Sequence, residues 1–285
     1  MSDLKIMFIA DLCGKGGRQA ASFLTRHLKE RFEADFVITN VENAAGGFGV
    51  TPEMSKKIFS YGTDVQTSGN HIWDRVDIIK YFNTDPKLLR PANFPKRAPG
   101  KGYIIEDCGG YKIAVINLMG RAYMKDLDCP FQVADFLLAK IKPETNIIFI
   151  DFHGEATAEK QAMMYHLDGQ VSAIVGTHTH VQTADEQVTE NGTAYITDAG
   201  MTGGYKSVIG MKIDPSLKRF LTGMPYRFTP SEEDVKMSGV VVTIDASTGR
   251  AKKIERFIED FDINNPPETN YNAMDDALDI AEEKN

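Results

Sequence analysis

The chain has 285 residues, of which 42% are hydrophobic and 25% are charged, which is the composition of a globular protein with a substantial core. It contains no apolar run long enough to span a membrane and no signal-peptide pattern at its N-terminus. We therefore expect a cytoplasmic protein without membrane contact. The three cysteines, Cys13, Cys108 and Cys129, show no paired spacing, which predicts reduced thiols and not a disulfide framework.

The formal net charge of −8 is concentrated at the C-terminal end of the chain. Residues 259–285 include nine acidic residues and one lysine, whereas residues 1–258 carry 31 acidic and 31 basic residues. An extended nucleic-acid track needs a basic face, so this distribution argues against one. A small anionic ligand is still allowed, because metal ions can supply local positive charge. We divide the chain into a main domain, residues 1–261, and an acidic extension, residues 262–285.

Short apolar runs alternate along the chain with segments of helical periodicity. The expected strands are residues 5–10, 36–40, 65–67, 103–107, 112–117, 147–152, 173–176, 194–197, 239–244 and 251–257. The expected helices are residues 19–32, 52–61, 75–82, 130–141 and 157–167, with a short acidic helix at 273–283. Turn residues at 109–110 and 245–249 predict two antiparallel hairpins. Together these elements predict an α/β fold with a mixed sheet or a pair of packed sheets.

Polar residues follow five of the expected strands at the point where each strand ends. They are Asp11, Glu42, Asn43, Asn70, His71, His153, His178 and His180. Ligands bind at the carboxyl ends of strands in an α/β sheet, so we expect these side chains to share one site. Carboxylates, amide oxygens and neutral imidazoles suit manganese, iron or zinc, and two such ions about 3.5–4 Å apart can hold a bridging hydroxide. Glycines beside them, among them Gly69 and Gly154, would let the backbone approach the ions.

Several of these residues also have a structural interpretation when each is taken alone. Asp11 could cap the following helix, Asn70 could serve a turn, and His153 could be a hydrogen-bonded core histidine. The two-residue spacing of His178 and His180, however, turns both imidazoles toward one site. Four of the six histidines lie at strand ends, which favours a metal centre over separate structural roles.

The order Asp, Glu-Asn, Gly-Asn-His, His, Gly-Thr-His-Thr-His resembles that of the calcineurin-like metallophosphoesterases. It is most similar to the YmdB-like branch, whose members act as bacterial cyclic-nucleotide phosphodiesterases. The similarity runs from Lys5 to about Phe257 and covers long stretches, among them Arg90-Pro-Ala-Asn-Phe-Pro95, Phe149-Ile-Asp-Phe-His153 and Gly176-Thr-His-Thr-His-Val-Gln-Thr-Ala-Asp185. The resemblance implies a metallophosphatase-like sandwich of two mixed β-sheets flanked by helices, and it allows a homo-oligomer without requiring one.

The resemblance also implies a role for each site residue. Asp11, Asn43 and His180 would bind a first metal ion, Asn70, His153 and His178 would bind a second, and Glu42 would bridge them. His71 would be the general acid that protonates the leaving alkoxide. The implied cofactors are two divalent or trivalent ions, iron or manganese first and zinc as an alternative. The implied reaction is attack of a bridging hydroxide on a small phosphodiester, a 2′,3′-cyclic nucleotide above all.

The chain departs from the wider superfamily at two positions. Cys13 stands where that superfamily has a histidine, and the bridging carboxylate is Glu42 instead of an aspartate. Both departures resemble the YmdB-like branch. A buried thiol explains Cys13 more simply than a metal ligand does.

Other functions compete with this interpretation. They are a broad-specificity phosphatase, a dinuclear amidohydrolase, and a nucleotide-binding regulator with incidental hydrolysis whose acidic tail contacts a partner. The late position of the histidine pair argues against the amidohydrolase. Arg90, Lys101 and Arg121 are candidates to contact phosphate or ribose, with surface or core-edge roles equally supported.

Overall fold

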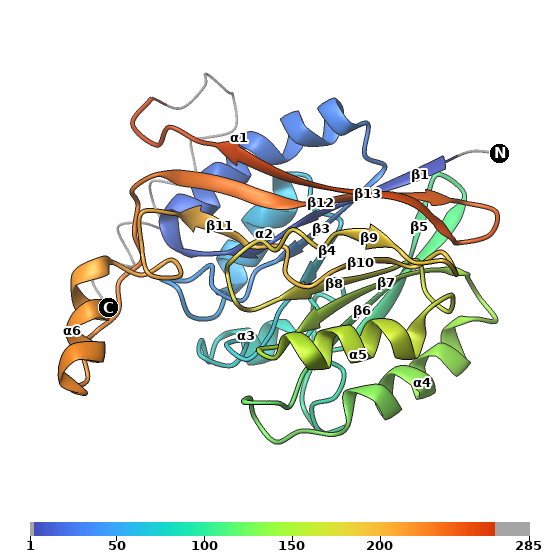
Figure 1. The fold of residues 1–285 in the computed structure, drawn as a ribbon, viewed down its shortest axis with the longest axis horizontal. Helices are drawn as coiled ribbons and strands as arrows, with labels where there is room; N and C mark the ends of the chain where they lie inside the picture. Colours follow the sequence, from blue (N-terminus) through green and yellow to red (C-terminus); the bar gives the residue numbers. More distant parts are fainter. Residues whose placement is uncertain (1–2, 266–285) are drawn as a thin grey trace.

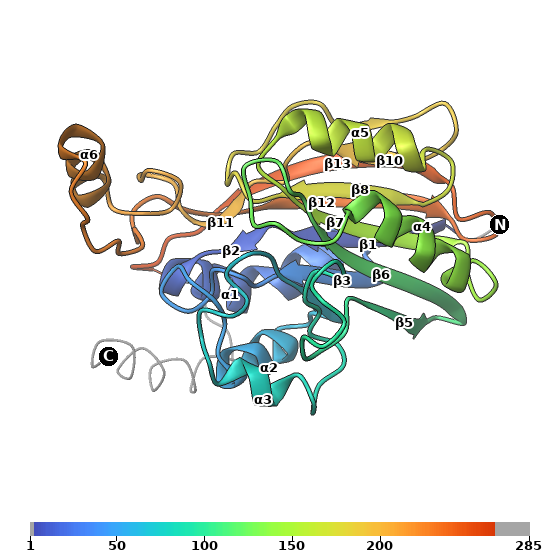
Figure 2. The ribbon, with the colours of Figure 1, turned by 90° about the horizontal axis from the view of Figure 1, so that it is seen from below.

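The computed structural model describes residues 3–265 of the chain. Two β-sheets pack face to face, and helices cover the outer face of each sheet (Figures 1 and 2). The predicted sandwich of two mixed β-sheets flanked by helices is therefore confirmed. The helix expected at 273–283 lies outside the described residues.

The first sheet has the strand order β2-β11-β12-β1-β3-β4, and β13 also pairs with β12. Its strands are β1 (Asp3–Ile9), β2 (Asp11–Leu12), β3 (Phe36–Asn40), β4 (Val65–Thr67), β11 (Met201–Gly204), β12 (Val235–Asp245) and β13 (Ala251–Asp260). β1, β3 and β4 run parallel, whereas β12 is antiparallel to β1. Residues of three helices pack on its outer face, namely α1 (Gly14–Phe32), α2 (Pro52–Ser60) and α3 (Ile78–Tyr81).

The second sheet has the order β5-β6-β7-β8-β10-β9. Its strands are β5 (Tyr103–Cys108), β6 (Tyr111–Met119), β7 (Ile147–His153), β8 (Ala173–Thr177), β9 (Gln187–Val188) and β10 (Ala194–Ile196). The four central strands are parallel, and β5 and β9 are antiparallel edges. Two helices, α4 (Pro130–Ile141) and α5 (Thr157–Leu167), cover its outer face (Figure 2).

The sequence of β1 is a continuous apolar run, and not an alternation of apolar and polar residues, because both faces of the strand are buried. Ile6 and Phe8 point between the two sheets, while Met7 and Ile9 pack under the helices of the first sheet. The ring of Phe8 stacks on that of Phe149 from β7, with 5.6 Å between the ring centres. Both faces of the strand are therefore buried, and the two sheets are joined through an apolar core.

The structure differs from the predicted elements in several places. α1 begins at Gly14 and not at residue 19, because the glycines of this stretch permit close packing against the first sheet. A Cβ on Gly17 would lie 2.3 Å from the carbonyl oxygen of Thr202 in β11. The helix expected at 75–82 is reduced to α3, and the short strands β2, β9 and β11 were not predicted.

One further helix, α6 (Ile213–Thr222), was not predicted and stands away from the two sheets (Figure 1). No helix within residues 3–265 is long and apolar enough to cross a membrane.

Candidate metal centre and its surroundings

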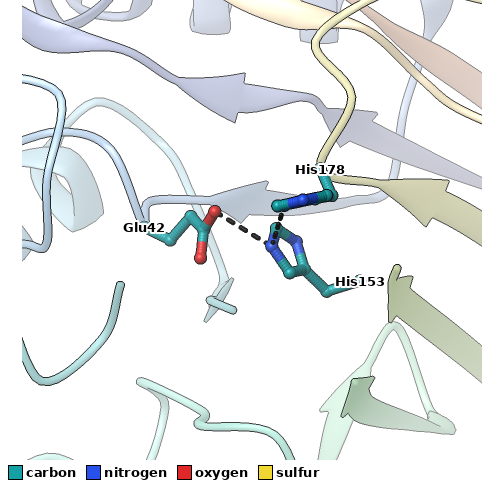
Figure 3. Close-up of side chains that lie close together, drawn as sticks. All are labelled: Glu42, His153 and His178. Atoms are coloured by element: carbon teal, nitrogen blue, oxygen red, sulfur yellow. Dashed lines mark hydrogen bonds and ion pairs between the residues drawn. The ribbon is translucent and has the colours of Figure 1, made fainter. Parts of the chain in front are cut away.

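The eight predicted site residues come from strand ends of both sheets. Asp11 opens β2, Glu42 and Asn43 follow β3, Asn70 and His71 follow β4, His153 ends β7, and His178 and His180 follow β8. Figure 3 shows Glu42, from the first sheet, facing His153 and His178, from the second. The packing of the two sheets therefore brings the strand ends of the first sheet and those of the second sheet to one site.

One set of side chains surrounds Nε2 of His153. This nitrogen lies 3.0 Å from Glu42 Oε1, 3.0 Å from Asn70 Oδ1 and 3.0 Å from His178 Nδ1. With metal–ligand bonds of about 2.1 Å, neighbouring ligand atoms of one ion lie about 3 Å apart. The spacing of these four atoms therefore suits a shared cation.

A second set lies around Nε2 of His180. This nitrogen is 3.3 Å from Asn43 Oδ1 and 3.5 Å from Asp11 Oδ2. These three residues are the ones that the resemblance assigns to a first metal ion, separate from the set around His153. Glu42 belongs to the set around His153, and both it and Asp11 are almost fully buried.

Two buried carboxylate oxygens indicate that the site suits a cation. Asp11 Oδ1 has no hydrogen-bond partner among the described residues, and Glu42 Oε1 faces the ring of His153, whose Nε2 lies 3.0 Å away. Leaving such a group unpaired in the interior costs about 1–3 kcal/mol, and more for a charged group. A bound metal ion would satisfy both oxygens, so the residues present fit a metal centre.

In His153, His178 and His180, one ring nitrogen contacts a neighbouring residue. The other ring nitrogen is therefore available as a metal ligand. The Thr177 hydroxyl donates to Asp151 Oδ1 at 2.7 Å, and its oxygen is therefore left to accept from His153 Nδ1 at 2.9 Å. His178 Nε2 lies 3.0 Å from Glu155 Oε2, and His180 Nδ1 lies 2.9 Å from the carbonyl oxygen of Ile209. Such partners orient metal-binding imidazoles and fix their tautomers.

The loop that carries His178 and His180 has an uncommon backbone. Both residues have positive φ angles, 105° and 64°, a region that non-glycine residues rarely adopt. Asp198 holds the loop: its Oδ2 accepts from the backbone N–H of Thr179 at 3.0 Å and from Lys160 Nζ at 2.8 Å. This buried ion pair keeps the histidines in a strained but defined position.

Charge interactions within the site shift several pKa values strongly. Burial alone would raise the pKa of Glu42, but the attraction of His153 overcomes it and lowers the pKa to about 2. Burial likewise opposes protonation of His153, yet Glu42 and Asp11 raise its pKa to about 9. Burial and the charge of His153 lower the pKa of His178 to about 3. Burial raises the pKa of Asp11 well above its usual range, which a bound cation would reverse.

His71 lies beside the candidate ligands and belongs to a histidine–aspartate pair. Its Nδ1 is 2.7 Å from Asp74 Oδ2, and its backbone N–H donates to Glu42 Oε2 at 3.2 Å. The contact with Asp74 occupies Nδ1 and leaves Nε2 as the ring nitrogen available for proton transfer. Asp74 was not among the predicted site residues, although its position three residues after His71 could have indicated the pair.

Other residues show what sequence reasoning missed or left open. Glu155 and Asp198 were not singled out, although Asp198 also follows a strand. Arg90 does not reach the site, since its buried guanidinium donates to the carbonyl oxygens of Pro91, Ala98 and Pro99. Burial raises the pKa of the Cys13 thiol to about 12.

Lys101 and Arg121 do not line the cleft beside the candidate ligands. Arg121 Nη2 lies 3.3 Å from Cys129 Sγ, and a contact of either residue with phosphate or ribose stays a prediction.

The fold and the site define a phosphoesterase of the metallophosphatase-like class. The chain matches the family model described as YmdB-like protein over residues 7–257, and it belongs to that family. It is 47% identical, over 255 residues, to the 2′,3′-cyclic-nucleotide 2′-phosphodiesterase of Bacillus subtilis, a match that covers 90% of this chain and 97% of the relative.

Two solved structures share the fold. The crystal structure of a phosphatase from Mycoplasma pneumoniae superposes with a TM-score of 0.85 at 34% identity, covering 91% of this chain and 95% of that one. A protein of Thermus thermophilus superposes with a TM-score of 0.84 at 35% identity, covering 90% of this chain and 99% of that one.

Proposed function

We propose that the chain hydrolyses 2′,3′-cyclic nucleotides with two bound metal ions, iron or manganese, and with His71 as general acid. The observation that carries the proposal is the convergence of seven candidate ligands into two adjoining sets next to His71. The similarity to the Bacillus subtilis enzyme supports the substrate class.

The ligand set suits an anionic substrate. Asp11 and Glu42 are its carboxylates, and the other members, Asn43, Asn70, His153, His178 and His180, bind metal in neutral form. Two divalent ions with two carboxylates leave the site with a net positive charge, which attracts a phosphodiester. When bound, the ions neutralise charge on the phosphoryl oxygens and lower the pKa of the attacking water.

The protein's own groups perform the remaining work. Hydrolysis forms a bond from water oxygen to phosphorus and breaks the bond from phosphorus to one ribose oxygen, which leaves as an alkoxide. His71 gives this oxygen its proton from Nε2, and Asp74 keeps the ring oriented through Nδ1. The contact of the His71 backbone with Glu42 holds the acid next to the candidate ligands.

The experiment is hydrolysis of 2′,3′-cyclic AMP by metal-free protein and by protein reloaded with manganese or iron. We expect turnover only after reloading, and its loss in His153→Ala. His166→Ala is the matched control, because this histidine is in α5 and pairs with Asp135 away from the site. Turnover that is independent of metal, or equal loss in both variants, would contradict the proposal.

A further inference from the structure

The cleft at the candidate metal centre has two unlike walls. It has a volume of about 360 Å³, within the range of small-molecule sites. One wall is polar and contains candidate ligands and His71. The other is apolar and contains Phe48, Val208, Ile209, Met211, Phe220 and Phe228. Ester hydrolysis uses only the polar wall, so the chemistry of the phosphate leaves the apolar wall unexplained.

Two aromatic residues of the apolar wall are held firmly. Phe48 and Phe228 are half-buried and pack against a small apolar cluster that contains Met211. The ring of Phe48 meets that of His71 edge-on at 5.0 Å, and the Arg219 guanidinium lies 5.0 Å from the ring centre of Phe228. Phe48 therefore lies next to the proposed proton donor, and both rings are held in place by their packing.

α6 supplies the outer part of this wall. Figure 2 shows the helix standing away from the two sheets, and Phe220 on it lines the cleft with 82% of its surface exposed. An exposed phenyl ring is unfavourable in water, and burying it would release about 25 cal/mol for each Å² covered. Other apolar residues of α6, Leu217 and Leu221, are also exposed, but Phe220 is the one that lines the cleft beside the candidate ligands.

We propose that Phe48, Ile209, Phe220 and Phe228 bind the nucleobase of the substrate. These four residues are called the base wall. The inference rests on the proposed function, since it names what the cyclic phosphate carries. A nucleobase is flat and apolar on its faces, and it lies on the ribose that holds the phosphate at the metal centre. Stacking on aromatic side chains accepts every base, because each base has a π-face.

The side chains of the base wall also predict which nucleobases the site prefers. Besides the candidate ligands and His71, the polar residues that line the cleft are Glu155, Thr179 and Ser216. Glu155 contacts His178, and the Ser216 hydroxyl donates to the carbonyl oxygen of Lys212 at 2.9 Å. The four residues of the base wall have no polar side chain to read base edges, so this wall discriminates by stacking area. Purine cyclic phosphates are therefore preferred to pyrimidine ones, and both to a base-free ester.

The test compares Phe220→Ala with Leu221→Ala on manganese-loaded protein. Leu221 is the next residue on the helix, is 75% exposed and does not line the cleft, which makes it a matched control. The substrates are 2′,3′-cyclic AMP and methyl riboside 2′,3′-cyclic phosphate, which lacks the base. Loss of one stacking contact should raise KM for cyclic AMP about 5- to 100-fold and change the base-free ester much less.

A second variant and a binding measurement complete the test. Phe228→Ala should act in the same direction, and calorimetric titration of adenosine 3′-monophosphate should show weaker binding to both phenylalanine variants. Equal effects on the two substrates would overturn the base wall. So would variants that alter sedimentation without altering base dependence, since the apolar wall would then be a contact between copies of the chain.

The same assay distinguishes a failure of the proposed function from a failure of the base wall. If the wild-type protein hydrolyses neither substrate, the proposed function fails. If it hydrolyses both with equal kcat/KM, the function stands and the base wall is wrong.

Discussion

Gly69 occupies a position where one added methyl group would disturb the candidate metal centre. A Cβ built on this residue would lie 2.3 Å from Glu42 Oε2, 2.3 Å from His153 Cδ2 and 2.4 Å from His153 Nε2. Its φ angle is not positive, so the requirement for glycine here is one of space and not of backbone conformation. Gly69→Ala therefore acts directly on two candidate ligands.

The size of the disturbance follows from these distances. Ordinary contacts to a Cβ begin at 3.4 Å, so the two ligands must move by about 1 Å, which can cost about 100-fold in turnover. Neither ligand can swing into solvent, because both are almost fully buried and His153 is held through Thr177. We expect metal affinity to fall about 10- to 100-fold as well, as it does when ligand orientation is lost.

The assay measures bound metal per chain by mass spectrometry after gel filtration, together with manganese-dependent hydrolysis of 2′,3′-cyclic AMP. Gly154→Ala is the control: this glycine adjoins His153, yet its Cβ would meet its nearest atom, Lys160 Cε, at an ordinary 3.7 Å. It should keep metal and activity. Wild-type metal content and turnover in Gly69→Ala would show that the added methyl group does not displace Glu42 or His153.

Three other predictions concern the surroundings of the centre. Asp198→Ala leaves the buried Lys160 ammonium unpaired and should lower the free energy of unfolding by about 3–5 kcal/mol, measured by urea denaturation; a loss below about 1 kcal/mol would contradict the role of this pair. His71→Ala should slow hydrolysis of 2′,3′-cyclic AMP about 10²- to 10⁴-fold and that of a nitrophenyl ester far less, whereas equal losses would remove the general-acid role. In metal-free protein the pKa of His153 is raised to about 9, so its contribution to stability is complete below its unfolded value of 6.5 and is lost as the pH rises through 9. Urea denaturation in a chelator at several pH values should show this decline, and a rise in the same window would contradict it.

The sequence predicted that the side chains of the candidate ligands lie close together, because strand ends impose a simple geometry. Apolar runs locate the strands, and the polar residue after each run must lie at the edge of the sheet, as Glu42 and His153 do. The two-residue spacing of His178 and His180 carried the same kind of local information. Which strands become neighbours follows from the packing of two sheets, which no local pattern specifies.

The outer part of the site was not predictable in this way. Phe220 is apolar and exposed, and its short helix α6 has no neighbouring strand to mark it. Glu155 contacts His178, and Asp198 pairs with Lys160. Both partners are distant in sequence, so these roles depend on tertiary contacts. The start of α1 also depends on a tertiary contact, because Gly17 permits close packing of the helix on β11.

The most direct measurement of the central claim is anomalous scattering from a crystal soaked in manganese. We expect two peaks per chain. One should lie about 2.0–2.3 Å from ligand atoms of Asp11, Asn43 and His180, the other at the same distance from Asn70, His153 and His178, with Glu42 contacting both. A single peak, or a peak bound by Cys13 in place of these residues, would contradict the two-metal centre.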